Sequence, residues 1–63
     1  MSLYQWEAQS KRGYVHAHGA ADAISLVYLR MTSLGFHLTF EDIDLEYVGS
    51  TDADDPFVLI TNN

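Results

Sequence analysis

The sequence predicts an α+β fold: a single β-β-α-β-β domain over residues 1–63, with one helix packed on one face of an antiparallel sheet. Two observations carry this prediction. Apolar and polar residues alternate in the first and last parts of the chain, and between them apolar residues recur at spacings of three and four. A chain of 63 residues is too short for a second core, and its 48% hydrophobic residues suffice to close one.

A β-hairpin is expected at the start of the chain. Residues 3–9 alternate, and one face of this segment is apolar because it holds Tyr4, Trp6 and Ala8. Residues 10–13 form the expected loop, in which Gly13 offers a positive φ. Residues 14–18 alternate again, so they are expected to form the second strand of the hairpin.

One amphipathic helix follows. Its apolar stripe is Ala20, Ile24, Val27, Met31 and Leu34. Asp22 suits the positive end of the helix dipole, and Gly35 is expected to end the helix in the left-handed conformation. Leu26 and Leu29 fall off the stripe. Either they pack under a loop, or they form an apolar surface for a partner or for a second copy of the chain.

The second half of the chain is expected to be extended from residue 36 to residue 48. Phe36, Leu38 and Phe40 share one parity, whereas Ile43, Leu45 and Tyr47 share the other. The segment must therefore change face near residues 41–42, through a β-bulge or a tight bend. A polar loop over residues 49–56 then leads into a last strand over residues 57–61.

The placement of the acidic residues is the main functional signal. The formal net charge is −6, and seven of the nine acids lie between residues 41 and 55. These candidate partner-binding residues are Glu41, Asp42, Asp44, Glu46, Asp52, Asp54 and Asp55. Asp42, Asp44 and Glu46 alternate with apolar residues, so a strand would space their carboxylates by about 6.6–6.8 Å on one face. Such a ladder either imitates a row of phosphates or is a solvated strand face.

Several other classes of function are disfavoured. With no cysteine and only three basic residues, the chain offers no disulfide or thiolate site and little attraction for nucleic acid. No nucleophile stands beside a base, so we expect no enzyme, no catalytic residue and no cofactor. His16 and His18 would share a strand face but lack a third metal ligand, and residues 52–55 lack the calcium-loop pattern. No leader or membrane span is expected, which favours the cytoplasm.

The run YVHAHGAADAISLVYLRMTSLGF, followed by EDIDLEYV, resembles a group of very small acidic phage-encoded inhibitors of bacterial machinery. This group includes anti-CRISPR proteins that imitate DNA and inhibitors of host RNA polymerase. The resemblance implies a stoichiometric inhibitor in the bacterial cytoplasm, with Asp42, Asp44 and Glu46 in the place of phosphates. The implied partner is the basic surface with which a type I CRISPR surveillance complex first engages DNA. The alternatives are a polymerase inhibitor and a homodimeric module that uses Leu26 and Leu29.

Overall fold

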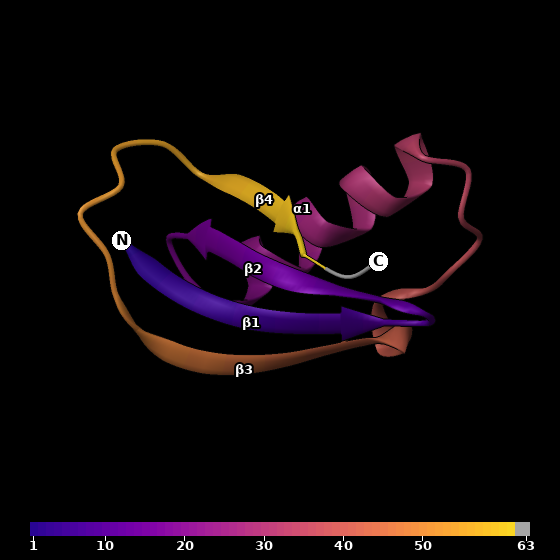
Figure 1. Ribbon diagram of the computed structural model, residues 1–63, viewed down its shortest axis with the longest axis horizontal. Helices are drawn as coiled ribbons and strands as arrows, with labels where there is room; N and C mark the ends of the chain where they lie inside the picture. Colours follow the sequence, from indigo (N-terminus) through magenta and orange to yellow (C-terminus); the bar gives the residue numbers. More distant parts are fainter. Residues whose placement is uncertain (62–63) are drawn as a thin grey trace.

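A computed structural model describes residues 1–61 and confirms the predicted α+β architecture (Figure 1). Four strands form one antiparallel sheet in the order β3-β1-β2-β4, and a single helix covers one of its faces. The elements in chain order are β1 (Ser2–Ala8), β2 (Lys11–Ala17), α1 (Ala20–Ser33), the short 3-10 helix η1 (Phe40–Asp42), β3 (Ile43–Ser50) and β4 (Phe57–Ile60). The hairpin β1–β2 is the centre of the sheet, so both later strands are edge strands.

The turn of the hairpin is shorter than expected. Ala8 pairs with Lys11, which leaves only Gln9 and Ser10 in the turn. Gln9 carries the positive φ, at 56°, so the expectation that Gly13 supplies it is wrong. Two-residue turns with positive φ follow the twist of the flanking strands, and this favours the short connection. The Gln9 side chain donates from Nε2 to the carbonyl oxygen of His37 at 2.7 Å, which ties the turn to the segment after α1.

Gly13 has a different role, because it lies inside β2 where another strand approaches closely. A Cβ atom at this position would lie 1.9 Å from the carbonyl oxygen of Leu59 and 3.0 Å from the Cα atom of Ile60. On the other side of β2, Trp6 pairs with Gly13, and the indole Nε1 donates to the carbonyl oxygen of Tyr14 at 3.2 Å. The missing side chain therefore lets β4 join the sheet.

The helix α1 begins and ends as the sequence predicts. Asp22, in the first turn of the helix, accepts a hydrogen bond from the backbone N–H of His18 at 3.3 Å, which holds the residues that lead into α1. At the other end Gly35 has a φ of 95°, and the backbone N–H of Phe36 donates to the carbonyl oxygen of Met31 at 3.1 Å. This pattern is a Schellman motif, for which a glycine is the usual residue.

The core lies between α1 and the sheet. Trp6 and Val15 from the strands meet Val27 and Met31 from the helix, and these four are the largest side chains that the structure buries completely. Leu26 is partly buried and packs against this core. Leu29 does not, because 62% of its surface is exposed on the outer side of the helix.

The segment after α1 is only partly the extended chain that was expected. Residues 36–39 belong to no strand, so the first part of the expected extended segment does not join the sheet, whereas the predicted tight bend is confirmed as η1. The bend is fixed because Asp42 Oδ2 accepts from the backbone N–H of Thr39 at 2.8 Å. Phe40 also packs edge-on against the ring of Tyr28, with centroids 4.7 Å apart. A further irregularity interrupts β3, where the register with β1 shifts beside Leu3 and Tyr4.

We predict that Gly13→Ala lowers the free energy of unfolding by about 2–3 kcal/mol, because β4 must move away from β2 to admit the methyl group. Chemical denaturation measures the loss, and faster amide exchange in β4 than in β1 locates it. Gly49→Ala is the matched control, since apart from its two neighbours in the chain no residue has an atom within 4 Å of its Cβ position. A tolerated Gly13→Ala, with unchanged exchange in β4, would contradict this role.

Candidate protein-binding face

The face of the sheet opposite α1 is not covered by any element of the described chain (Figure 1), and exposed carboxylates of β1 and β3 project from it. Because successive strand residues point to opposite faces, the residues that alternate with buried Trp6 and Ile43 project from this open face. Glu7 from β1 and Asp44 and Glu46 from β3 are exposed there. We call these three residues the acidic strip.

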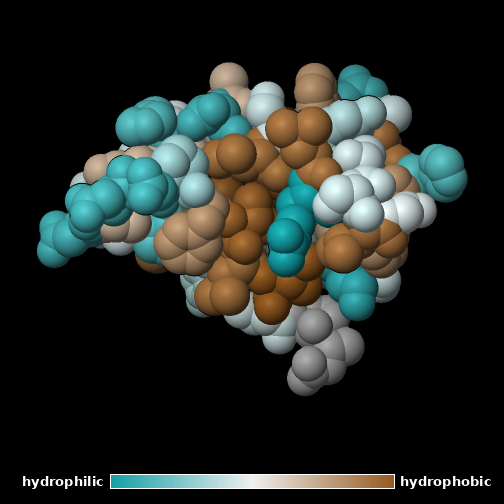
Figure 2. Space-filling view, turned by 90° about the horizontal axis from the view of Figure 1, so that it is seen from above, coloured by the Kyte–Doolittle hydropathy of each residue, from teal (hydrophilic) through white to brown (hydrophobic). Residues whose placement is uncertain are grey.

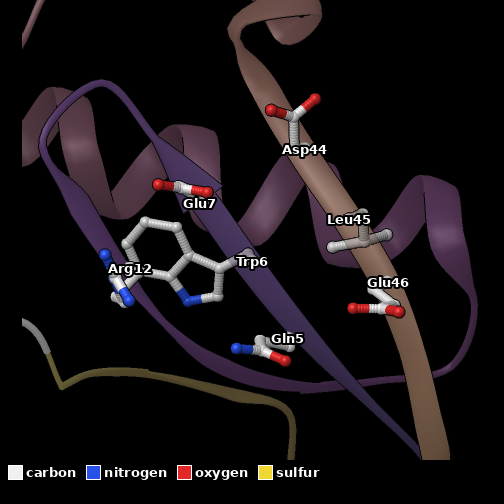
Figure 3. A pocket seen from close by; sticks show the side chains of 7 residues that line it. All are labelled: Gln5, Trp6, Glu7, Arg12, Asp44, Leu45 and Glu46. Carbon is white, nitrogen blue, oxygen red and sulfur yellow. The ribbon is translucent and has the colours of Figure 1, made fainter.

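The acidic strip surrounds one shallow hollow (Figure 3). Glu7 lies directly opposite Asp44 on β3 and directly opposite Arg12 on β2, so it stands between a like charge and an opposite one. Gln5 pairs with Glu46 in the next row of the sheet. The hollow has a volume of about 170 Å³, and the three carboxylates, Gln5 and Arg12 all contribute to its lining.

The electrostatics of the strip are unfavourable for the isolated domain. Side chains directly opposite one another on adjacent strands have Cβ atoms about 4.5–5.5 Å apart, and like charges at that distance are destabilising. Arg12 offsets this repulsion for Glu7, which is its direct neighbour, but it lies two strands away from Asp44 and Glu46. A concentration of negative charge thus remains at the β3 side of the open face, where it is available to a cation.

The other half of the open face is apolar. Tyr14 on β2 pairs with Leu59 on β4, and His16 pairs with Phe57. The rings of His16 and Phe57 are stacked, with centroids 4.3 Å apart, and His16 Nδ1 is buried without a hydrogen-bond partner. Phe57 and Leu59 remain 46% and 49% exposed. The open face is therefore divided between charge on β1 and β3 and apolar surface on β2 and β4.

The structure separates the predicted acidic residues into three places. Asp44 and Glu46 lie in β3 and project from the open face as predicted, whereas Asp42 lies in η1 with its carboxylate bound to Thr39 and so leaves the ladder. Glu41 is exposed in the same 3-10 turn. Asp52, Asp54 and Asp55 are exposed in the loop at the far end of β3 (Figure 1).

Sequence reasoning missed Glu7 and Arg12. The alternation in residues 3–9 placed Glu7 on the face opposite Trp6, and this was the available signal. Its neighbours could not be read from that pattern, because the pairing of β1 with β3 joins residues that are 37 positions apart, Glu7 and Asp44. The role of Glu7 therefore follows only from the order of the strands.

The arrangement places three carboxylates in the lining of one hollow, and concentrated negative charge attracts cationic groups. Among residues 1–61, no three histidine, aspartate or glutamate side chains come together as metal ligands. The two candidate histidines diverge, because β2 ends at Ala17: His16 stacks on Phe57, and His18 is exposed beyond the strand.

No helix in the described part of the chain has the length and apolar character needed to cross a membrane.

The fold and this face define a small α+β domain whose sheet exposes one half-acidic, half-apolar face. Comparison of the chain with protein-family models, with curated proteins and with solved structures finds no match.

We predict that Asp44→Asn raises the free energy of unfolding by about 0.2–1 kcal/mol at low salt, because it removes the repulsion from Glu7. Roughly 0.5 M salt should abolish most of this gain by screening. Asp54→Asn removes one charge from the loop and is the control, which should change stability less. Chemical denaturation at both salt concentrations measures the difference; an equal effect of the two substitutions would show that only net charge matters.

Proposed function

We propose that the chain is an inhibitory protein-binding module whose acidic strip docks onto a basic, nucleic-acid-binding surface of a bacterial protein complex. One observation carries the proposal: three exposed carboxylates from two adjacent strands surround a single hollow, although their mutual repulsion lowers the stability of a very small domain. If these charges served only to keep the protein soluble, they could be spread farther apart over its surface. Their concentration is explained by a partner that supplies the counter-charge.

The remaining acids extend the negative charge along the β3 edge. Glu41 stands at one end of β3, and Asp52, Asp54 and Asp55 follow its other end, in a molecule whose longest dimension is 31 Å. Lysine and arginine side chains that normally hold phosphates can meet carboxylates in the same way, through charge-assisted hydrogen bonds. Because the Asp42 carboxylate is engaged with Thr39, Glu7 replaces it in the proposed contact.

For the partner, the proposal names the surface with which a type I CRISPR surveillance complex engages target DNA, so that the chain would be an anti-CRISPR protein that imitates DNA. The resemblance of the hairpin, helix and acidic strand to such phage proteins supports this choice, and the low number of basic residues agrees with a ligand that competes with DNA. The alternative partner is host RNA polymerase. Both surfaces bind nucleic acid, and an experiment on captured complexes distinguishes them.

The test uses two variants with the same net charge. The triple variant Glu7→Gln, Asp44→Asn, Glu46→Gln neutralises the acidic strip and takes the formal charge from −6 to −3. The control variant Ala21→Lys, Ser25→Lys, Leu29→Lys adds three positive charges to exposed positions of α1, and it also reaches −3. Each variant is compared with the wild type for capture of a complex from bacterial lysate and for competition with DNA on that complex.

We predict that the strip variant loses capture and DNA competition by about 100-fold or more in affinity, whereas the control variant keeps both to within about fivefold. Capture by the wild type should also weaken steeply with rising salt, because the contact is electrostatic. Circular dichroism establishes that both variants are folded. Equal losses in the two variants, or a folded strip variant that still displaces DNA, would overturn the proposal.

A further inference from the structure

The two edges of the sheet are protected very differently. The β3 edge carries Asp44 and Glu46, and its pairing with β1 is interrupted by a register shift, two features that prevent one edge strand from adding to another. The β4 edge has neither. Its four residues, Phe57–Ile60, are uncharged and apolar, and they pair with β2 without a register shift. An uncharged apolar edge strand is a surface to which another strand can add.

The hydrogen-bond pattern shows which backbone groups of β4 are free to pair. The backbone N–H of Thr61 donates to the carbonyl oxygen of Arg12 at 3.0 Å, so these two residues form a hydrogen-bonded pair. In an antiparallel ladder hydrogen-bonded and non-hydrogen-bonded pairs alternate. Phe57 and Leu59 therefore direct their backbone groups toward β2, whereas Val58 and Ile60 direct theirs outward, away from the sheet.

These outward groups are complementary to a second copy of the same strand. When two β4 strands run antiparallel about a two-fold axis at Leu59, Val58 of one copy faces Ile60 of the other, and the reverse. Each of these pairs exchanges two N–H···O=C bonds. This register therefore uses both outward N–H groups and both outward carbonyl groups of each strand. Moving the two-fold axis by one residue, to Val58, shifts the register by two residues; it would place Pro56, which lacks an N–H, opposite Ile60 and lose bonds.

The side chains and charges agree with this register. The two Leu59 side chains meet at the axis on the open face, and the half-buried Val58 and Ile60 meet on the helix side. Asp54 and Asp55 precede β4 and lie beyond the paired residues, so no acid stands opposite another acid within residues 57–61. Figure 2, which looks down on β4 and α1, shows a broad apolar area there beside the hydrophilic loop.

We propose that β4 is a homodimerisation strand, and that two copies of the chain join through it into one eight-stranded antiparallel sheet. The order of strands would be β3-β1-β2-β4-β4-β2-β1-β3, with both helices on the same face and the acidic strips at the two outer edges. Because only four residues pair, the interface is smaller than a standard one, and we expect a weak dimer that dissociates on dilution.

The first measurement follows the wild-type chain by sedimentation equilibrium and amide exchange from about 5 µM to about 1 mM. The mass should rise from 7.1 kDa toward twice that value. Over the same range the amides of Val58 and Ile60 should become protected, whereas those of Phe57 and Leu59, already bonded to β2, should exchange slowly throughout. A constant monomer mass with fast exchange of Val58 and Ile60 at every concentration would overturn the proposal.

A matched pair of variants locates the interface. Leu59→Lys places two like charges opposite each other at the axis and should weaken dimerisation about tenfold or more. Leu29→Lys makes the same substitution at an exposed leucine of α1 and should leave the dissociation constant within about twofold. Loss of the dimer in Leu29→Lys with retention in Leu59→Lys would overturn the β4 interface and assign the contact to the helix.

Discussion

The close approach of β4 to β2 at Gly13 is the constraint on which the rest of the architecture depends. A side chain there would collide with the Leu59 carbonyl, and without β4 the sheet would lose the strand that brings Val58 and Ile60 against the core. Trp6, the largest buried side chain, pairs with the same glycine and donates its indole hydrogen bond to the next carbonyl of β2. One missing side chain thus fixes both the position of the fourth strand and that of the central core residue.

The order of strands that results determines how the open face is divided. With β1 and β2 in the centre, the acid-bearing β3 lies at one edge and the uncharged β4 at the other. Glu7 is therefore added to the carboxylates of β3, and the ring stack of His16 and Phe57 lies at the opposite edge. The sheet then carries negative charge at one edge, where we propose that a basic partner binds, and an apolar strand at the other, where we propose that a second copy of the chain adds.

Features that depend on local sequence were predictable, and features that depend on distant pairing were not. The helix could be predicted from its periodicity and from Gly35, since the motif that ends it involves residues only a few positions apart. Asp44 and Glu46 could be placed on one face by their alternation. The roles of Gly13 and Glu7 could not be predicted, because the neighbour of each belongs to a strand formed more than thirty residues later. The hydrogen bond from Thr39 to Asp42 was missed because the alternation of polar and apolar residues predicted that Asp42 belongs to the strand, whereas it lies in the 3-10 turn.

The concentration of negative charge between β1 and β3 can be measured directly, without a partner. Paramagnetic relaxation of each backbone amide is compared in the presence of a cationic and of a neutral nitroxide. We predict that the cation is enriched most at amides around Glu7, Asp44 and Glu46, and little along the outer side of α1 or along β4. Enrichment that is uniform over the molecule, or that is centred on residues 52–55 alone, would contradict it.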